Sequence, residues 1–317
     1  MSFINQKNEF EQNKKIYESA LLSFKDTDGF DVYNTSIPFE QGGGMYIFGR
    51  VERRSEWARS WVRLFERTGE DTYTLVPDSM IYQLEDPYIT EVDGQFVLGG
   101  THVRLKQGQI DTYYGYFYKG TDIHDLFYFT TGPDYMKDIR LVQMSGNKIG
   151  VFSRPRSEEI RAKYGSESII GFTTINSLDE LRSDVIECAP VIEGLFAKDE
   201  WGGCNQCYYL DSGYIGVIGH KCYKEMRDGI ELLVYVNIAF VVDPDAQKCL
   251  NTKIIATRSC FPDYPAKKSD LTDCVFASGI VMRSDGKADL YSGLGDTAEG
   301  RAVIDYPFEG YGKIVSS

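Results

Sequence analysis

One pattern recurs along this chain, and its clearest copy is GYIGVIGHK at residues 213–221. A turn glycine comes first, then a mostly apolar run, and then a small residue followed by a polar one. Four other stretches share the pattern: GMYIFGR (44–50), GQFVLGGTH (94–102), GNKIGVFSR (146–154) and GKADLYSGLGD (286–296). Short apolar runs bounded by turn residues are typical of buried β-strands. The intervals between the leading glycines are 50, 52, 67 and 73 residues, which is room for one four-stranded antiparallel sheet each.

Five such sheets predict an all-β fold, a five-bladed β-propeller, because a β-sandwich would not repeat one unit at this period. We expect residues 1–317 to form one propeller domain, with residues 1–28 as a short N-terminal helical extension. Apolar residues near helical spacing predict a helix within residues 7–24, and a second short helix is expected around residues 156–164. The apolar run of each repeat is expected to form the innermost strand of its blade, where small residues allow close packing.

The overall charge restricts the partners. The chain has 34 Lys and Arg residues against 47 Asp and Glu residues, a formal net charge of −13, which disfavours nucleic acid and anionic membranes. No apolar run of about 18 residues and no signal-peptide core is visible, so we predict a cytoplasmic protein. The seven cysteines are irregularly spaced, which fits reduced thiols. The single Cys204–Cys207 pair lacks a second pair, and we expect no metal site.

Each repeat ends on a polar group, and rotation of the blades should place these ends at equivalent positions around a central channel. The groups are Arg50 with Glu52, His102 with Arg104, Arg154, His220 with Lys221, and Asp296. Any one of them alone is an ordinary solvated residue at a strand end. Cations dominate the set although the chain is acidic, which predicts a cationic pocket for a small anion such as phosphate. His124, the third histidine, is expected to lie in a surface loop.

A further motif lies between the first two repeat ends, YQLEDPYIT at residues 82–90. Pro87 restricts its own backbone and favours an extended Asp86, so Asp86 should be held rigidly at a strand start. Glu85-Asp86-Pro87 before an apolar β segment resembles the catalytic motif of the inverting β-mannoside phosphorylases. Four short stretches match the same proteins: RVE (50–52), IGH (218–220), FASG (276–279) and LYSGLGD (290–296). The chain most resembles their relatives, the β-1,2-mannan mannosyltransferase-phosphorylases, formerly a domain of unknown function, over residues 34 to 305.

The resemblance implies a five-bladed propeller and assigns roles within it. Asp86 would be the general acid toward the glycosidic oxygen in phosphorolysis and the base in synthesis. The phosphate-binding set would be Arg104, Arg154, His220 and Lys221. Residues expected to contact sugar are Arg50, Glu85, His102, Trp201, Asn205, Gln206 and Asp296. Tyr88 stands where the phosphorylases usually have Arg, which leaves donor or acceptor recognition open and fits the mannosyltransferase branch better.

Part of the sugar assignment comes from the residues themselves. In WGGCNQ (201–206), Trp201 can stack on a pyranose, the glycines permit close backbone approach, and Asn205 and Gln206 offer donors and acceptors. A buried Trp at a tight turn is an equally good interpretation.

Three functions remain open from the sequence. An inverting glycoside phosphorylase or mannosyltransferase on β-mannosides needs one acid and cations for phosphate. It would use phosphate or mannose 1-phosphate with a mannose-containing oligosaccharide, and no cofactor beyond phosphate as co-substrate. A glycoside hydrolase on the same fold needs a second carboxylate, for which Glu52, Asp273, Asp296 and Glu299 are candidates. The third is a non-catalytic glycan-binding propeller.

Overall fold

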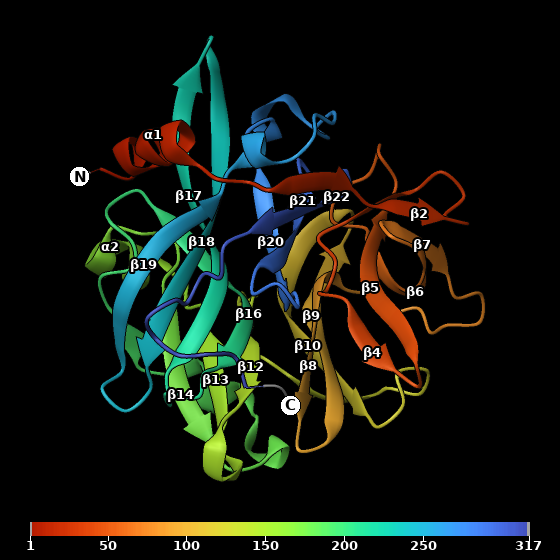
Figure 1. Ribbon diagram of the computed structural model, residues 1–317. Coiled ribbons are helices and arrows are strands. Elements are labelled where there is room, and N and C mark those ends of the chain that lie inside the picture. The colour runs from red at the N-terminus through yellow and green to blue at the C-terminus, as the bar shows by residue number, and fades with distance from the viewer. Residues whose placement is uncertain (1, 316–317) are drawn as a thin grey trace.

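Five sheets form a five-bladed β-propeller in the computed structural model, which describes residues 2–315 (Figure 1). Their strands pair in antiparallel fashion except for β2 (Ser23–Lys25) and β7 (Thr72–Leu75), which pair in parallel. Blade 2 contains β8 (Glu85–Val92), β9 (Gln95–Lys106), β10 (Gln109–Gly120) and β11 (Phe127–Thr131). Blade 3 contains β12 (Arg140–Gln143), β13 (Ile149–Ser153), β14 (Ile170–Ile175) and β15 (Val191–Ile192). Blade 4 contains β16 (Trp201–Tyr209), β17 (Ile215–Arg227), β18 (Ile230–Asp243) and β19 (Lys248–Ala256). The repeat count in the sequence therefore predicted the architecture correctly.

The first and last blades are built from both ends of the chain. Blade 1 contains β3 (Asp31–Tyr33), β4 (Phe39–Gln41), β5 (Gly44–Glu52), β6 (Trp61–Gly69), β7 (Thr72–Leu75) and β2 (Ser23–Lys25). Blade 5 contains β20 (Val275–Met282), β21 (Ala288–Leu294), β22 (Ala298–Ile304) and β1 (Glu18–Leu21). β1 pairs with β22 in antiparallel register, so the N-terminal strand completes the last blade and closes the ring.

The repeated apolar run is the second strand of each blade and not the innermost one, so that expectation was wrong. β8 contacts β5 and β12, β12 contacts β16, and β16 contacts β20, which places the first strands around the axis. The runs themselves lie in β5, β9, β13, β17 and β21. A second strand is flanked by strands on both sides and covered on both faces by neighbouring sheets, so its sequence reads as continuously apolar.

The core is divided among the contacts between blades. Five clusters of buried apolar residues each join two neighbouring sheets. Phe48 and Leu98 join blades 1 and 2, for example, and Ile218 and Leu290 join blades 4 and 5. No blade has an apolar core of its own. Each blade therefore depends on its neighbours for the burial that stabilises it.

The N-terminal helix exists, but with other bounds than residues 7–24. α1 covers Phe3–Asn13, and its Ser2 cap accepts a hydrogen bond from the Asn5 amide at 3.4 Å. Residues 18–25 instead form β1 and β2, because Leu22 and Phe24 pack into the apolar cluster between blades 5 and 1. The second predicted helix is confirmed as α2 (Glu158–Tyr164), and a third, α3, covers Ser183–Glu187.

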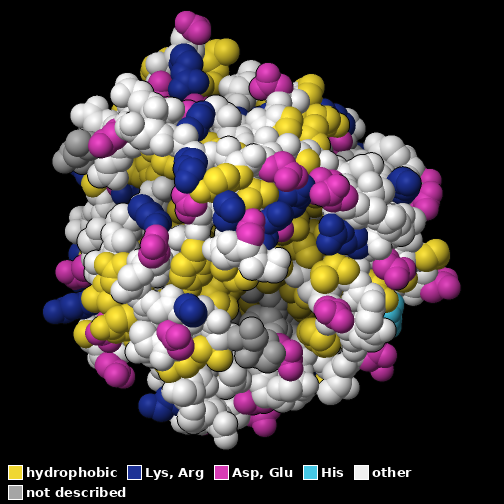
Figure 2. Space-filling model, in the orientation of Figure 1, with side chains coloured by type: hydrophobic (Ala, Val, Ile, Leu, Met, Phe, Trp, Pro, Cys, Tyr) yellow, Lys and Arg dark blue, Asp and Glu magenta, His cyan; other side chains and the backbone are white. Residues whose placement is uncertain are grey.

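The surface carries charges of both signs, and Figure 2 shows them interspersed over the face in view. His124 is exposed, as predicted. Within residues 2–315, all seven cysteines are free thiols, and no group of three or more His, Cys, Asp and Glu side chains is placed to hold a metal ion. No helix in that range has the length and apolar character needed to cross a membrane.

Arg301 of β22 links both ends of the chain where the ring closes. Its buried guanidinium donates to Asp71 at 2.6 and 2.9 Å, to Glu18 of β1 at 2.5 Å and to Asp289 at 3.2 Å. Asp71 lies in the turn between β6 and β7 of blade 1. The single guanidinium therefore connects blade 5, the closing strand and blade 1.

Replacing Arg301 with Ala should leave Asp71 and Glu18 without their cation and destabilise the closure, whereas Asp289 keeps its ion pair with Arg283. Loss of one partner of a buried ion pair costs about 3–5 kcal/mol, and we expect about 2–3 kcal/mol because the carboxylates are partly exposed. Urea unfolding measures this, with Arg53→Ala as the control, since Arg53 is exposed and pairs only with Glu56. Equal unfolding midpoints for the two variants would contradict the assigned role of Arg301.

Candidate active site

Each blade places one polar residue in or next to its innermost strand, at a local irregularity of the backbone. β8, β16 and β20 shift register near Asp86, Asn205 and Ser278. Asn34 follows β3 and Asp138 precedes β12. All five side chains are buried, and their spacings along the chain are 52, 52, 67 and 73 residues. We call Asn34, Asp86, Asp138, Asn205 and Ser278 the polar ring.

Three members of the polar ring have left-handed backbone. The φ angles of Asn34, Asp86 and Asp138 are 44°, 49° and 57°. The expectation of an extended Asp86 was therefore wrong. Asn and Asp tolerate this region better than most residues, but it is still strained for a residue before proline. Strain of this kind is retained where the surroundings hold the residue in place, and for Asp86 those surroundings are hydrogen bonds to its carboxylate.

Arg50 and Asn34 hold that carboxylate. Arg50 Nη1 donates to Asp86 Oδ1 at 2.8 Å, and Asn34 Nδ2 donates to the same oxygen at 2.8 Å. Arg50 Nη2 donates to Glu85 Oε1 at 3.1 Å, and its Nε donates to Ser60 at 2.7 Å. Arg50 belongs to β5 of blade 1 and Asp86 to β8 of blade 2. The catalytic candidate is thus fixed by a charge-assisted network between two blades.

The two neighbouring carboxyl groups are driven toward different protonation states. Burial acts to raise the pKa of Asp86, but the positive charges of Arg50 and Lys137 outweigh it, and the pKa lies below its ordinary value. Burial dominates at Glu85 and raises its pKa despite Arg50. Asp86 is therefore the stronger acid of the pair. Such a separation is typical of acid–base sites.

A second charged group lies beneath this pair, around Asp138. Arg154 Nη1 donates to Asp138 Oδ2 at 2.6 Å, and His220 Nε2 is 3.9 Å from the same oxygen. His220 Nδ1 is 2.7 Å from Asn205 Oδ1. Burial, reinforced by Arg154, lowers the pKa of His220 to about 3. His220 is thus a neutral imidazole near pH 7.

A funnel of about 540 Å³ opens above Asp86. Asn34, Arg50, Glu85, Asp86 and Asp296 line it, and burial raises the pKa of Asp296. Three cations also line the funnel, and none has an ion-pair partner among residues 2–315. They are Lys137, Arg156 and Lys268. Asp270 also lines the funnel, so four acidic and four basic residues meet there. The three cations without an ion pair remain available to bind an anion.

The structure brings only part of the predicted site together. Arg50, Glu85, Asp86 and Asp296 line the funnel. Arg154, His220 and Asn205 form the group beneath it. His102 lines a neighbouring cavity and stacks on Tyr116 with ring centroids 4.5 Å apart.

Four predicted residues neither line the funnel nor join the group around Asp138: Arg104, Lys221, Gln206 and Trp201. The expectation that they would meet around the central channel was wrong. The Arg104 side chain is 56% exposed and pairs with Asp111 at 2.7 Å, near the end of the long strand β9. Lys221 pairs with Glu200 at 2.6 Å. Successive side chains on a strand point to opposite faces, and His220 already takes the channel side. The same alternation separates Gln206 from Asn205, and Gln206 donates to the Ile89 carbonyl at 2.9 Å.

Trp201 lies behind the funnel wall. It is buried, and its indole packs edge-on against Tyr235 with ring centroids 6.3 Å apart. Tyr235 lines the funnel, whereas Trp201 lines a separate hollow with Phe3. Of the two interpretations of this residue, the buried Trp fits the structure.

Six residues of the site had no role predicted from the sequence: Asn34, Lys137, Asp138, Arg140, Arg156 and Lys268. Arg140 is 3.8 Å from Asp138 and donates to the Asn205 carbonyl at 2.6 Å. A detectable signal existed for two of the six, because Asn34 and Asp138 stand 52 residues before and after Asp86. That spacing matches the interval between repeat glycines. Lys137 carried no pattern beyond its place next to Asp138.

Comparison with known proteins agrees with the five-bladed fold. Residues 8–310 match the family model described as a protein of unknown function, DUF1861. The chain therefore belongs to the DUF1861 family. No curated protein matches the chain.

Several solved structures are similar to this chain. The mannose phosphorylase MPT-4 of Leishmania mexicana, in complex with phosphate ion, is 50% identical, with a TM-score of 0.94 over 99% of this chain and 96% of that chain. The GDP-Man-dependent mannosyltransferase MPT-1 of the same organism is 48% identical, with a TM-score of 0.93 over 100% and 99%. A glycosyl hydrolase from Bacteroides ovatus, at 14% identity and a TM-score of 0.59 over 90% and 87%, shares the fold.

Glu299 supports the polar ring from below. It is fully buried and accepts hydrogen bonds from Ser278 Oγ at 2.8 Å and from the Thr35 amide at 3.2 Å. Thr35 follows Asn34, the donor to Asp86. Burial raises the pKa of Glu299 to about 8. The neutral acid is therefore the form present near pH 7.

Glu299 should make stability depend on pH. The folded protein keeps its proton up to about pH 8, whereas the unfolded chain releases it near pH 4.5. The folded state thus binds more protons in this window, and stability falls as pH rises through it. The free energy of unfolding of the wild type should therefore fall by on the order of a few kcal/mol between pH 5 and pH 8, and Glu299→Gln should remove this fall.

The measurement is the melting temperature of both proteins across that range. As pH rises, the melting temperature of the wild type should fall relative to that of Glu299→Gln. Glu66→Gln is the control, since Glu66 is exposed on β6. A difference that stays constant with pH would show that Glu299 is ionised in the folded protein.

Proposed function

We propose that this protein is an inverting glycoside phosphorylase or mannosyltransferase that exchanges a mannosyl group between a β-mannoside and phosphate. The observation that carries the proposal is the Asp86 carboxylate, held by Arg50 and Asn34 in a funnel lined by three cations without ion-pair partners. The mannose phosphorylase MPT-4 and the mannosyltransferase MPT-1 support it, since each is nearly half identical to this chain over its full length.

In phosphorolysis, a phosphate oxygen attacks the anomeric carbon, and the bond from that carbon to the leaving sugar oxygen breaks. The leaving oxygen needs one proton, and Asp86 delivers it. Hydrogen phosphate loses one proton as it becomes the sugar phosphate, so the proton count balances if Asp86 relays that proton. In synthesis, Asp86 takes a proton from the acceptor hydroxyl while mannose 1-phosphate loses its phosphate. The lowered pKa keeps Asp86 ionised near pH 7, which is the form that can accept this proton.

The cations hold the phosphate, and the carboxylates hold the sugar. Lys137, Arg156 and Lys268 can orient phosphate in line with the anomeric carbon. Glu85 and Asp296 offer oxygens to sugar hydroxyls. We propose phosphate as a co-substrate with no further cofactor, a β-1,2-linked mannooligosaccharide as the second substrate, and the cytoplasm as the location.

A hydrolase on this fold needs a second carboxylate across the sugar, and three of the four candidates are occupied elsewhere. Glu52 is fully buried and bonded to Tyr33, Ser60 and Lys267. Asp273 pairs with Lys7 at 2.8 Å. Glu299 lies under the polar ring. Only Asp296 shares the funnel with Asp86. The cations of the funnel favour phosphate over a water nucleophile.

GDP-mannose is a second candidate donor, favoured by the 48% identity to MPT-1. A diphosphate leaving group would use the same cations as phosphate does. The two donors differ in the nucleoside, so a direct comparison of donors separates them.

Purified protein incubated with β-1,2-mannobiose and phosphate should release mannose 1-phosphate, and no mannose should form without phosphate. Asp86→Asn should reduce turnover in both directions by about 10²–10⁴-fold, the usual contribution of general acid–base catalysis. Glu85→Gln, the matched control next to Asp86, should reduce it less. Anomer-resolved NMR identifies the product, and calorimetry verifies that Asp86→Asn still binds mannobiose.

Three results would contradict the proposal. Release of mannose in plain buffer would make the protein a hydrolase. Binding without turnover by the wild type would make it a glycan-binding propeller. Transfer from GDP-mannose, with no reaction of mannose 1-phosphate or phosphate, would make it a nucleotide-sugar transferase.

Lys137 and Arg104 provide a test of which cations bind phosphate. Lys137→Ala should raise the KM for phosphate by about tenfold, because charged hydrogen bonds to an anion contribute about 1.5–3 kcal/mol and the other two cations remain. The same substitution at Arg104 should have a smaller effect, since its guanidinium pairs with Asp111. Initial rates against phosphate concentration measure both. A larger effect at Arg104 would support the sequence prediction that Arg104 binds phosphate.

A further inference from the structure

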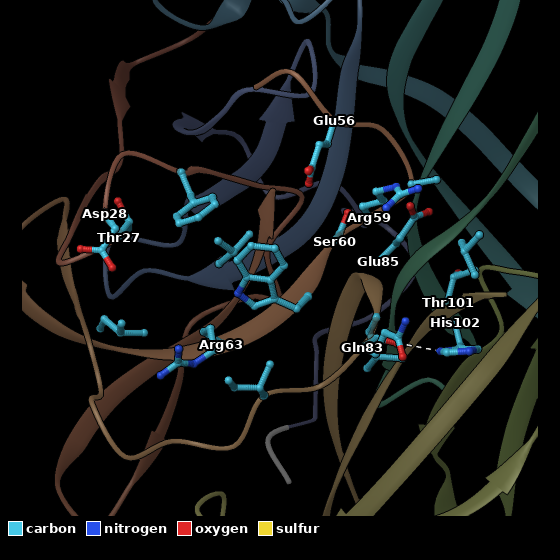
Figure 3. Close-up of a pocket in the computed structure, with 18 of the residues that line it drawn as sticks. Thr27, Asp28, Glu56, Arg59, Ser60, Arg63, Gln83, Glu85, Thr101 and His102 are labelled. Atoms are coloured by element: carbon cyan, nitrogen blue, oxygen red, sulfur yellow. Dashed lines mark hydrogen bonds between the residues drawn. The ribbon is translucent and has the colours of Figure 1, made fainter. Parts of the chain in front are cut away.

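A larger cavity lies next to the funnel, between blades 1 and 2. Its volume is about 940 Å³, against about 540 Å³ for the funnel. The two hollows share Ala58, Glu85, Thr101 and Val103 as lining residues. A chain bound next to Asp86 can therefore continue past Glu85 into this cavity, which we call the side cleft. Figure 3 shows Glu85, Thr101 and His102 on one side of it and Thr27 and Asp28 on the other.

The side cleft has apolar aromatic surface within a polar rim. Phe30 and Trp61 both line it and pack edge to face with ring centroids 5.1 Å apart. Trp61 is half-buried, so part of its ring remains accessible. Sugars bind to such sites because their C–H faces pack on aromatic rings while their hydroxyls bond to polar groups at the edge.

The charges of the side cleft favour a neutral ligand. Its acidic residues are Asp26, Asp28, Glu56 and Glu85, and its basic residues are Arg59, Arg63 and Arg104. The funnel lining has four basic and four acidic residues, and three of its cations have no ion pair within residues 2–315. In the side cleft only Arg59 and Arg63 lack an ion pair within that range, because Arg104 pairs with Asp111. A nucleoside diphosphate would meet net negative charge here, whereas an uncharged oligosaccharide would not be repelled.

We propose that the side cleft binds the mannosyl units on the leaving-group side of the bond that is made or broken, and so makes the enzyme prefer long acceptors. This inference rests on the proposed function. The funnel holds the transferred mannosyl group together with phosphate, and the cations there leave the opposite side of the anomeric carbon for the acceptor. Pockets of about 300–1,000 Å³ enclose ligands larger than one sugar ring. The side cleft therefore accommodates several units of the acceptor.

The test measures mannosyl transfer from mannose 1-phosphate to β-1,2-mannobiose through β-1,2-mannohexaose. The wild-type KM for the acceptor should fall with each added unit and then level off once the side cleft is filled. Arg59→Ala and Trp61→Phe should raise the KM for the hexaose by about tenfold, with the KM and kcat for mannobiose changed less than twofold. Arg59 is exposed and has no ion pair within residues 2–315, so its removal should not disturb folding. Trp61→Phe keeps an aromatic ring against Phe30.

Arg67→Ala is the matched control, because Arg67 is an exposed arginine of β6, the strand that contains Trp61 and follows Arg59, and donates to the carbonyls of Gly69 and Glu70. It should leave the KM unchanged at every length. Two results would overturn the role assigned to the side cleft while leaving the proposed function intact. They are a wild-type KM that does not depend on acceptor length, and equal effects of Arg59→Ala on the KM for mannobiose and for the hexaose. No turnover of mannobiose at all would instead contradict the proposed function.

Discussion

The buried guanidinium of Arg50 is the group on which the site depends. A cation removed from water is tolerated only when its donors are satisfied, and Arg50 satisfies three of them through Ser60, Glu85 and Asp86. Two of these acceptors belong to the next blade. Arg50 therefore fixes the position of blade 2 relative to blade 1 at the same point where it fixes the catalytic carboxylate. Arg154 has a similar role further round the ring, where it joins Asp138 of blade 3 to the Gly202 carbonyl of blade 4.

The polar ring explains why one structural repeat can carry a site without five-fold symmetry. Every blade supplies a polar residue in or next to its innermost strand, but the residue type changes from amide to carboxylate to hydroxyl. Of the two carboxylates in the polar ring, Asp86 alone lines the funnel. Asp138 pairs with Arg154, and Asn205 and Ser278 bond to His220 and Glu299. A common backbone device thus positions five side chains, and the neighbours of each decide its chemistry.

The sequence predicted the fold better than it predicted the site, for a physical reason. The five-fold repeat was visible because a doubly covered second strand must be apolar along its length, and β5 and β17 obey this rule. The polar ring was hidden because its members are single residues at irregular points of the backbone. The errors at Lys221 and Gln206 come from the alternation of side chains along a strand. Their neighbours His220 and Asn205 face the channel, so Lys221 and Gln206 point to the opposite face. Knowing which of two adjacent residues faces the axis requires the register, and bulges change the register locally.

The acidic net charge and the cationic funnel have a common explanation in the pairing of charges. Arg50 and Arg154 are neutralised by buried carboxylates, so they add little to the field felt by a ligand. Lys137, Arg156 and Lys268 have no ion pair within residues 2–315, and they line the funnel beside four acidic residues. The side cleft also carries both signs, but its acidic residues outnumber its basic ones, and one of the three, Arg104, pairs with Asp111. The two hollows differ in the ligand that each can accept, and Glu85 lies where they meet. A substrate that spans both must carry its negative charge at one end and a neutral polyol at the other, which is the combination formed by phosphate, a mannosyl group and an acceptor chain.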